Sequence, residues 1–180
     1  KGGLWALPFC SALGWSGVGC GQTVADVQLG VLQYRGGGDW YANPTAVPNL
    51  VRFCNEEMGM ELSADVPYVE VGSTELFNHP WLHMTGHGNV VLSNRESEQL
   101  RSYLQSGGFL HISDNYGMDP YVRAAMAKVF PDLDWGEVPL DNPGYHQQYD
   151  VSEGLPKSHA HDDFPPPGHG LFPAGRRSRL

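Results

Sequence analysis

The stretch WLHMTGHGNVVLSNRESEQLRSYLQSGGFLHISDNYG (residues 81–117) predicts a strand, a helix and a second strand in that order. Its first part is short, apolar and aromatic and stops at the polar run 86–89, which is typical of a buried strand. Residues 109–113 repeat this pattern and stop at a second polar run, residues 114–117. The sequence therefore predicts two buried strands that each end in a polar loop.

The segment between these strands has the features of one amphipathic helix. Ser93 and Glu96 have the spacing of a capping box, in which each side chain satisfies a backbone amide of the first turn. Leu100 and Tyr103 give the helix an apolar face, and Gly107 ends it. Two parallel strands joined by one helix form a right-handed crossover, so both polar loops lie at the carboxyl ends of neighbouring strands. Open α/β sheets place their ligand crevice at that edge.

The rest of the domain continues the alternation of strand and helix. Further strands are predicted at residues 27–34, 66–71 and 134–140, and further helices at residues 43–58 and 119–129. Asn43 is expected to cap the first of these helices, with Pro44 in its first turn. Residues 141–170 predict a long, His- and Pro-rich excursion over the surface. The pattern as a whole indicates an α/β fold with a mainly parallel sheet.

The composition indicates a single acidic domain. The 180 residues carry 20 acidic and 11 basic side chains, a formal net charge of −9, which argues against a nucleic-acid partner. Residues 23–172 suit one α/β domain with its own core. Residues 173–180 carry no strand pattern and are interpreted as an irregular basic tail.

The first 22 residues predict a secretory signal peptide that lacks its initiator Met. Lys1 precedes an apolar run, residues 4–13, that is too short to span a bilayer and is followed by small residues. The alternative is an apolar N-terminal arm of the domain. Residues 17–20 faintly resemble a lipoprotein cleavage site, so a lipoprotein and a soluble secreted form both stay open. We expect export to the periplasm or cell envelope, with no transmembrane span in the mature domain.

Three polar residues are candidates for catalysis: His87, Asp114 and His146. His87 lies between two glycines at a strand end, and Asp114 follows the next strand, although either residue could instead shape or cap its loop. His146 lies in the excursion, which we expect to fold back over the same edge of the sheet. Imidazoles beside carboxylates suit acid–base chemistry or a divalent metal. No spacing here is diagnostic of a metal, and HExxH is absent.

A glycine-rich loop supplies most of the candidates for ligand binding. Three glycines, residues 36–38, allow the backbone to approach a ligand or to turn tightly. Asp39 is followed by Trp40 and Tyr41, and a carboxylate beside two aromatic rings suits sugar stacking; the rings could equally anchor the loop to the core. The candidate ligand-binding residues are Gly37, Gly38, Asp39, Trp40, Tyr41, Gly86, Gly88, Asn89, Asn115, Tyr116 and Tyr145.

Other reactive side chains are interpreted as structural. His83 and His111 lie inside predicted strands, where a hydrogen-bonded core histidine is a better interpretation than a ligand. The sequence offers no clear nucleophile: GxSxG is missing, no Cys follows a strand, and Ser113 lacks the glycines of a nucleophile elbow. Acyl-enzyme chemistry is therefore poorly supported.

Four blocks of sequence resemble the bacterial family of domains of unknown function 4159 (DUF4159). The blocks are GGGDWYANPTAVPNL, MTGHGN, GGFLHISDNYGMD and DNPGYHQQYDVSEGLPKSHAHD, and the resemblance covers residues 27–172. It implies an exported protein related to the class I glutamine amidotransferase-like superfamily, nearest to trehalose-utilisation-type proteins. It also implies a flavodoxin-like three-layer sandwich, in which a parallel sheet lies between helices.

The chain departs from this family at several positions. Amidotransferases of the superfamily carry a catalytic Cys after a central strand, where this chain has Ser113, Asp114 and Asn115, so glutaminase chemistry is not implied. Ser113 also replaces a family Asp, and Asn142 replaces a family His. Residues 173–180 differ from the family's next strand, which predicts a C-terminally incomplete sheet; truncation and an altered reading frame both stay open.

Two functions follow from this sequence. The first is a binding or accessory domain that holds a small molecule or carbohydrate in a crevice at the strand ends. The alternative is a hydrolase-like or carbohydrate-active enzyme that uses His87, Asp114 and His146, with or without a divalent metal. The missing nucleophile favours the binding domain. The sequence indicates neither a particular cofactor nor an oligomeric state.

Overall fold

The computed structural model describes residues 27–151, 153–155 and 166–173 of the chain. Four strands form one parallel sheet in the order β2-β1-β3-β4. These strands are β1 (Gly30–Gln33), β2 (Tyr68–Glu70), β3 (Trp81–His87) and β4 (Phe109–Tyr116). The predicted mixed α/β class and mainly parallel sheet are confirmed, and the strand order is consistent with a flavodoxin-like fold.

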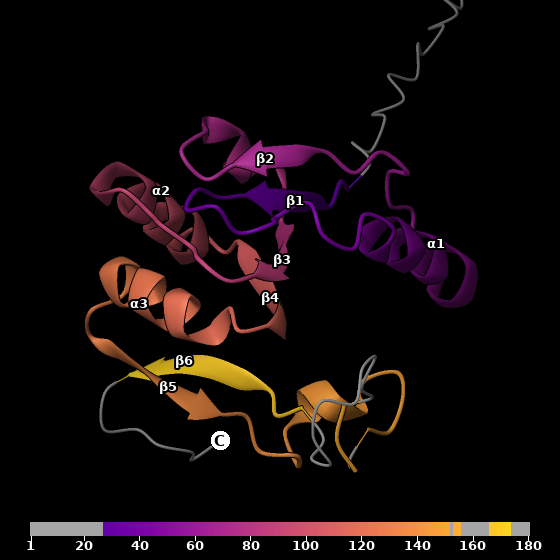
Figure 1. Cartoon of the computed structure of the whole chain (residues 1–180). Coiled ribbons are helices and arrows are strands. Elements are labelled where there is room, and N and C mark those ends of the chain that lie inside the picture. Colours follow the sequence, from indigo (N-terminus) through magenta and orange to yellow (C-terminus); the bar gives the residue numbers. More distant parts are fainter. Residues whose placement is uncertain (1–26, 152, 156–165, 174–180) are drawn as a thin grey trace, which may run out of the picture.

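Helices cover both faces of this sheet (Figure 1). They are α1 (Ala46–Met58), α2 (Asn94–Gln105) and α3 (Asp119–Val129), with a short 3-10 helix, η1 (Thr74–Asn78), after β2. On one face, Leu82 of β3, Leu100 of α2 and Val122 of α3 belong to the larger hydrophobic core. On the other face, Val47 and Val51 of α1 form a second, smaller core.

The stretch from residue 81 to residue 117 folds as a strand, a helix and a strand, as predicted. The capping box is confirmed: Ser93 Oγ accepts the backbone N–H of Glu96, and Glu96 Oε2 accepts the backbone N–H of Ser93. Both strands run further than the sequence indicates, because parallel pairing continues through Gly86 with Asp114 and through His87 with Tyr116. The polar residues therefore belong to the strand ends and not to loops.

The start of α1 differs from the prediction. Thr45, not Asn43, is the N-cap residue, and its side chain makes no capping hydrogen bond. Asn43 has a φ of 55°, in the left-handed region that asparagine tolerates better than most residues. Its side-chain amide donates to Asn115 Oδ1 over 2.7 Å. The expectation that Asn43 caps the helix is wrong, because this side chain binds the end of β4 instead.

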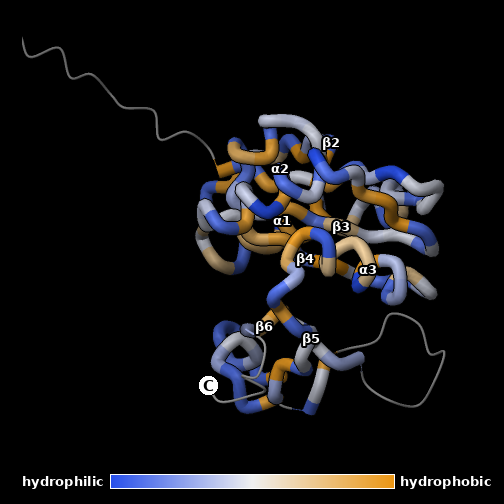
Figure 2. Tube along the Cα trace, turned by 90° about the vertical axis from the view of Figure 1, so that its left-hand side faces the viewer, coloured by the Kyte–Doolittle hydropathy of each residue, from blue (hydrophilic) through white to orange (hydrophobic). Residues whose placement is uncertain are grey.

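A separate two-stranded sheet follows α3. It pairs β5 (Leu133–Glu137) with β6 (His169–Pro173) in antiparallel register, and η2 (Pro143–His146) lies between them in the sequence. Figures 1 and 2 both place this sheet below α3 and β4. Arg123 of α3 lies 5.1 Å above the ring of Trp135. The sequence indicates a strand only for the first partner; β6 is missed because it is short and contains a glycine. The predicted leader and residues 174–180 lie outside the described residues.

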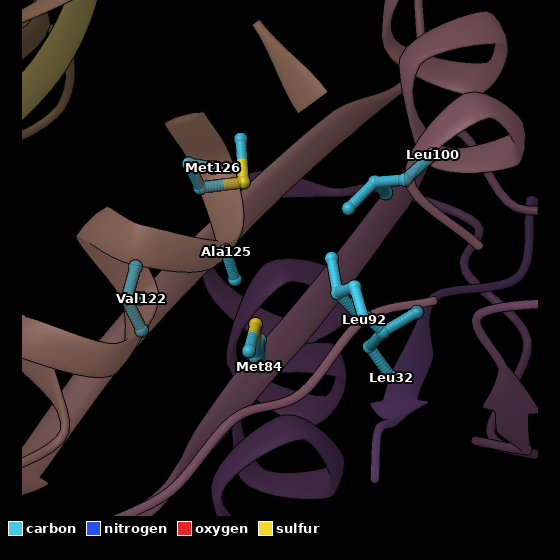
Figure 3. A pocket seen from close by; sticks show the side chains of 7 residues that line it. All are labelled: Leu32, Met84, Leu92, Leu100, Val122, Ala125 and Met126. Atoms are coloured by element: carbon cyan, nitrogen blue, oxygen red, sulfur yellow. The ribbon is translucent and has the colours of Figure 1, made fainter. Parts of the chain in front are cut away.

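A small apolar cavity lies in the larger core between the sheet, α2 and α3. Figure 3 shows its lining side chains, which come from the sheet, both helices and the segment before α2: Leu32, Met84, Leu92, Leu100, Val122, Ala125 and Met126. Its volume is about 10 Å³, and no polar side chain lines it. A cavity of this size without polar partners holds no water, so it is a packing void and not a ligand site.

Replacement of Leu82 by Ala tests this core. The Leu82 side chain is fully buried, so Leu82→Ala should lower the free energy of unfolding by about 2–5 kcal/mol. Leu50→Ala on α1 is the control, because Leu50 is 37% exposed and should cost about 1 kcal/mol or less. Urea denaturation measures both values, and equal losses would contradict the described core.

Candidate functional site

The carboxylate of Asp39, in the loop after β1, binds His87 at the end of β3. Asp39 Oδ2 lies 2.9 Å from His87 Nδ1, and Asp39 Oδ1 accepts the backbone N–H of His87. Two hydrogen bonds hold the pKa of the Asp39 carboxyl below its usual value. The larger effect comes from the backbone N–H of His87 and the smaller one from its imidazole. We call these two residues the Asp39–His87 pair.

The Asp39–His87 pair lies where the order of the strands reverses. The chain passes from β1 through α1 to β2 on one side, whereas it passes from β3 through α2 to β4 on the other side. In open α/β sheets, and at the β1/β3 position of flavodoxin-like sheets in particular, this reversal is the usual place for a ligand. Asp39 follows β1 and His87 ends β3, so both border that position.

The contact with Asp39 orients the imidazole of His87. A carboxylate on Nδ1 assigns the proton to that nitrogen, so Nε2 presents its lone pair. The His87 side chain is 56% exposed. The hydrogen bonds of the described residues leave Nε2 without a partner. An exposed nitrogen held in this way can accept a hydrogen bond from a ligand hydroxyl, take up a proton or bind a metal ion.

Tyr34 is buried close to the pair, and its hydroxyl leaves no room for a side chain at position 86. Its hydroxyl donates to the backbone carbonyl of Thr85 over 3.1 Å. A Cβ on Gly86 would lie 2.3 Å from the Tyr34 hydroxyl and 3.1 Å from Asp39 Oδ1, and the φ of Gly86 is +147°. Burial, followed by the negative charges of Asp39 and Asp114, raises the pKa of Tyr34 to about 12. Tyr34 is therefore a neutral hydrogen-bond donor that supports the strand end.

The carboxylate of Asp114 caps the start of α3. Its Oδ1 accepts the backbone N–H of Met118 and its Oδ2 accepts that of Asp119, each over 2.9 Å. These amides belong to the first turn of a helix and have no partner within the helix itself. Asp114 pairs with Gly86 at the carboxyl end of β4, and its oxygens bind backbone amides, which is the capping alternative left open by the sequence.

Asn115 joins three segments at the same edge. Its Oδ1 accepts the Asn43 side-chain amide from the loop before α1 and lies 3.4 Å from the hydroxyl of Thr85 on β3. The pairing of β3 and β4 shifts at this point, because Gly86 pairs with Asp114 whereas His87 pairs with Tyr116. A β-bulge of this kind redirects side chains at a strand end. The loop after β1 is thus tied to both central strands.

The glycine-rich loop returns along the end of β3. Gly38 donates its backbone N–H to the carbonyl of Asn89, and Arg35 accepts the backbone N–H of Val91. Gly37 has a φ of +88°, and Gly88, beyond β3, has a φ of +70°, so both turns favour glycine. These contacts hold the candidate residues of the two glycine-containing segments next to each other.

Aromatic residues follow Asp39 in the loop and stand opposite His87 in the register of β4. Trp40 packs against the larger core and makes edge-to-face contacts with Tyr41 and Tyr68, with ring centroids 5.4 and 5.2 Å apart. Tyr41 is 61% exposed, and Tyr116, the pairing partner of His87 on β4, is 66% exposed. Trp40 therefore anchors the loop, while the side chains of Tyr41 and Tyr116 are largely exposed.

The candidate residues of the excursion, Tyr145 and His146, make their contacts within the excursion and the β6 region. His146 Nδ1 lies 3.2 Å from Asp150 Oδ1, and its Nε2 lies 3.0 Å from the carbonyl oxygen of Leu140. Tyr145 is buried, and a Cβ on Gly168 would lie 2.1 Å from its hydroxyl. The described part of the excursion is therefore stabilised by Tyr145 and His146.

The structure brings together Asp39 and His87, whereas Asp114 caps α3 and His146 binds within the excursion. Sequence reasoning missed Tyr34 and Thr85, which support the strand ends from below. The sequence signal for them is weak: Tyr34 ends a predicted strand directly before a glycine-rich loop.

The described residues contain no metal centre with three or more protein ligands. No group of three or more His, Cys, Asp or Glu side chains is arranged among them to hold a metal ion. None of the helices in the described part of the chain combines the length and hydrophobicity that a membrane crossing requires.

His83 and His111 lie inside β3 and β4, as predicted, and contact each other through Nδ1. His83 is buried, and this burial, followed by the charge of a protonated His111, lowers the pKa of His83 to about 4. His111 keeps an exposed edge, but its ring lies against Trp81 and His83, and this partial withdrawal from water lowers its pKa as well. The prediction of a buried, hydrogen-bonded histidine is confirmed for His83, whereas His111 is exposed, so the interpretation of His111 as a core histidine is wrong.

The depressed pKa of His83 predicts a loss of stability in acid. Unfolded His83 takes up a proton near pH 6.5 and the folded residue only near pH 4, so protonation favours the unfolded chain across this window. The free energy of unfolding should fall as the pH drops from 7.5 to 5, by up to about 1.4 kcal/mol per pH unit from this residue. Urea denaturation in chelator-treated buffer should give a shallower pH slope for His83→Gln; an unchanged slope would contradict the assignment.

The role of Asp114 predicts a structural effect of its removal. Asp114→Ala leaves two first-turn amides of α3 without their acceptors, and should lower the free energy of unfolding by about 0.5–2 kcal/mol. Asp119→Ala is the matched comparison, because it removes an exposed (i, i+4) ion pair with Arg123, which contributes about 0.3–0.5 kcal/mol, and a first-turn carboxylate, but leaves the acceptors of both amides in place. Thermal and urea denaturation compare the two, and an Asp114 variant as stable as the wild type would show that this carboxylate is not a cap.

Comparison with known families supports the resemblance drawn from the sequence blocks. Residues 28–180 match the family described as domain of unknown function (DUF4159). No curated protein matches the chain. The matched segment includes the glycine-rich loop, both central strands and the Asp39–His87 pair. The chain therefore belongs to the DUF4159 family.

Proposed function

We propose that this chain is an exported domain that binds a small polar ligand of the carbohydrate class at the carboxyl ends of β1 and β3. The Asp39–His87 pair is the observation that carries the proposal. It offers a carboxylate and an oriented imidazole at the reversal point of the sheet, where open α/β folds bind ligands. The imidazole Nε2 would accept a hydrogen bond from a ligand hydroxyl.

The neighbouring tyrosines support a sugar as the ligand. Tyr41 follows the Asp39 loop, and Tyr116 is paired with His87, so both exposed rings belong to the segments that hold the pair. Aromatic faces pack against the apolar face of a sugar ring, while polar groups bind its hydroxyls. A carboxylate, an imidazole and two tyrosines supply both kinds of contact.

The same residues argue against glutaminase chemistry. β3 ends in Thr85, Gly86 and His87, and β4 runs through Ser113 and Asp114, so no Cys lies at either central strand end. Cys54 lies in α1 and packs against the smaller core. A relationship to the class I glutamine amidotransferase-like superfamily, and to trehalose-utilisation-type proteins, would then be one of architecture without the nucleophile. Export to the periplasm or cell envelope is proposed from the apolar run near the N-terminus.

The ligand proposal can be tested with a panel of neutral mono- and disaccharides. Binding is followed by the NMR signals of the His87 imidazole, which should shift on addition of a sugar that binds at the pair. His87→Ala and Asp39→Asn should each weaken binding of that sugar about tenfold or more, because each removes a hydrogen-bonding partner of the ligand or of the imidazole.

Two measurements make this test decisive. His146→Ala is the matched histidine control, because His146 binds within the excursion and should leave the sugar affinity unchanged. The midpoint of thermal unfolding of His87→Ala should stay close to that of the wild type, since its side chain is mostly exposed. If no sugar moves the His87 signals, or if the variants bind as well as the wild type, the proposal fails.

Hydrolysis is the second candidate function, and the orientation of His87 favours it. A carboxylate on Nδ1 with an exposed Nε2 is the arrangement of a general base that activates water. Water would add to the anomeric carbon of a bound disaccharide while its proton passes to Nε2, and Asp39 would stabilise the imidazolium that forms. The glycosidic C–O bond would break, and the departing sugar oxygen would take a proton from solvent. Release of product from a disaccharide that binds, abolished in His87→Ala, would establish this function; binding without any product supports the binding domain.

A further inference from the structure

We propose that His83 and His111 form a two-imidazole site for a divalent first-row metal ion, with Cu²⁺ bound most tightly. This site is separate from the Asp39–His87 pair: His83 lies four positions earlier on β3, and its contact is with β4. The two histidines are direct pairing partners on neighbouring parallel strands. The sheet itself therefore fixes their separation.

The distance between the two nitrogens suits metal coordination. His83 Nδ1 lies 3.0 Å from His111 Nδ1, and the ring planes differ by 16°. Two imidazole nitrogens bound to one ion at 2.0–2.1 Å, at angles between square-planar and tetrahedral, lie about 2.9–3.4 Å apart. The observed spacing falls within that range, so the separation of the two nitrogens needs little change on binding, although the rings must turn to direct both lone pairs at the ion.

Trp81 restricts the orientation of both rings. It stacks against His83 with centroids 5.8 Å apart and planes 1° apart, and against His111 with centroids 5.6 Å apart and planes 15° apart. Trp81 also packs against the smaller core beneath α1. A stacked ring on both imidazoles reduces the conformational freedom that metal binding would otherwise have to restrict.

The protons at the site balance without a change in charge. A hydrogen bond between two neutral imidazoles requires one Nδ1 to carry the proton, whereas a metal-bound nitrogen carries none. The donor ring therefore moves its proton from Nδ1 to Nε2, and both Nδ1 lone pairs then face the ion. His111 keeps an exposed edge, so solvent can carry this proton and water can fill the remaining coordination positions. The described residues add no third His, Cys, Asp or Glu to the cluster.

The choice of metal follows from the ligands. Imidazole binds Cu²⁺, Ni²⁺ and Zn²⁺, and the affinity of a given nitrogen site rises from Ni²⁺ to Cu²⁺ and then falls at Zn²⁺. Mg²⁺ and Ca²⁺ prefer oxygen ligands and should not bind here. We therefore expect the order Cu²⁺ above Ni²⁺ and Zn²⁺, with no binding of Mg²⁺.

Titration of the full chain with CuCl₂ tests the site. Isothermal titration calorimetry measures the affinity, and quenching of tryptophan fluorescence reports whether the ion lies near Trp81. His83→Gln and His111→Gln should each weaken Cu²⁺ binding about tenfold or more, because even the loss of a group that only orients a metal ligand costs about that much. His111 is the more exposed of the two, so His111→Gln keeps the test valid if His83→Gln fails to fold.

Matched variants exclude other sources of binding. His87→Gln removes the imidazole of the Asp39–His87 pair, and a His159→Gln, His161→Gln double variant removes a further pair of nearby histidines in the sequence. Both should keep the high-affinity site. Trp81→Phe should keep the calorimetric affinity but lose most of the quenching. If the His83 and His111 variants bind Cu²⁺ as tightly as the wild type, or if the double variant loses all binding, the proposed site is wrong.

Discussion

The edge of the sheet that carries the candidate site depends on a single carboxylate. Asp39 binds the backbone amide of His87 with one oxygen and its imidazole with the other, and so fixes the glycine-rich loop to the end of β3. The two residues are 48 positions apart in the sequence. Without this contact, the loop between β1 and α1 would still be held by the packing of Trp40, the backbone contacts with residues 89–91 and the Asn43 contact with β4, but nothing would fix its carboxylate to the end of β3. The same hydrogen bonds orient the imidazole, so one interaction supports both the fold and the candidate chemistry.

Close packing beneath this contact restricts which residues the edge can contain. The Tyr34 hydroxyl occupies the space that a side chain on Gly86 would need, and the positive φ of Gly86 favours glycine independently. Tyr34 in turn holds the carbonyl of Thr85. Its hydroxyl stays protonated because burial and two nearby carboxylates disfavour a phenolate. A rigid support of this kind fixes the position of His87, which is what a binding site on a strand end requires.

The sequence predicts the local elements of the fold better than the contacts that form the site. The capping box of Ser93 and Glu96 and the two strands around it depend on neighbouring residues, and all are found. The edge position of Asp39, His87 and Asp114 follows from strand direction alone. Which carboxylate binds the histidine depends on tertiary packing, and sequence spacing contains no signal for it. Asn43 shows the same limit: its sequence context indicates a helix cap, but the bulge in β4 places an acceptor within its reach.

The two carboxylates at this edge differ because of what their oxygens bind. Both oxygens of Asp114 accept amides of α3, so its hydrogen bonds are made within the fold and its removal acts on stability. The oxygens of Asp39 also have partners, but one partner is an imidazole on a largely exposed side chain, whose second nitrogen makes no hydrogen bond to the described residues. By holding the proton on Nδ1, Asp39 thus keeps the other ring nitrogen, Nε2, available as an acceptor. Of the two carboxylates, only Asp39 can influence a bound molecule through a neighbour, and for this reason the proposed function rests on Asp39 and His87.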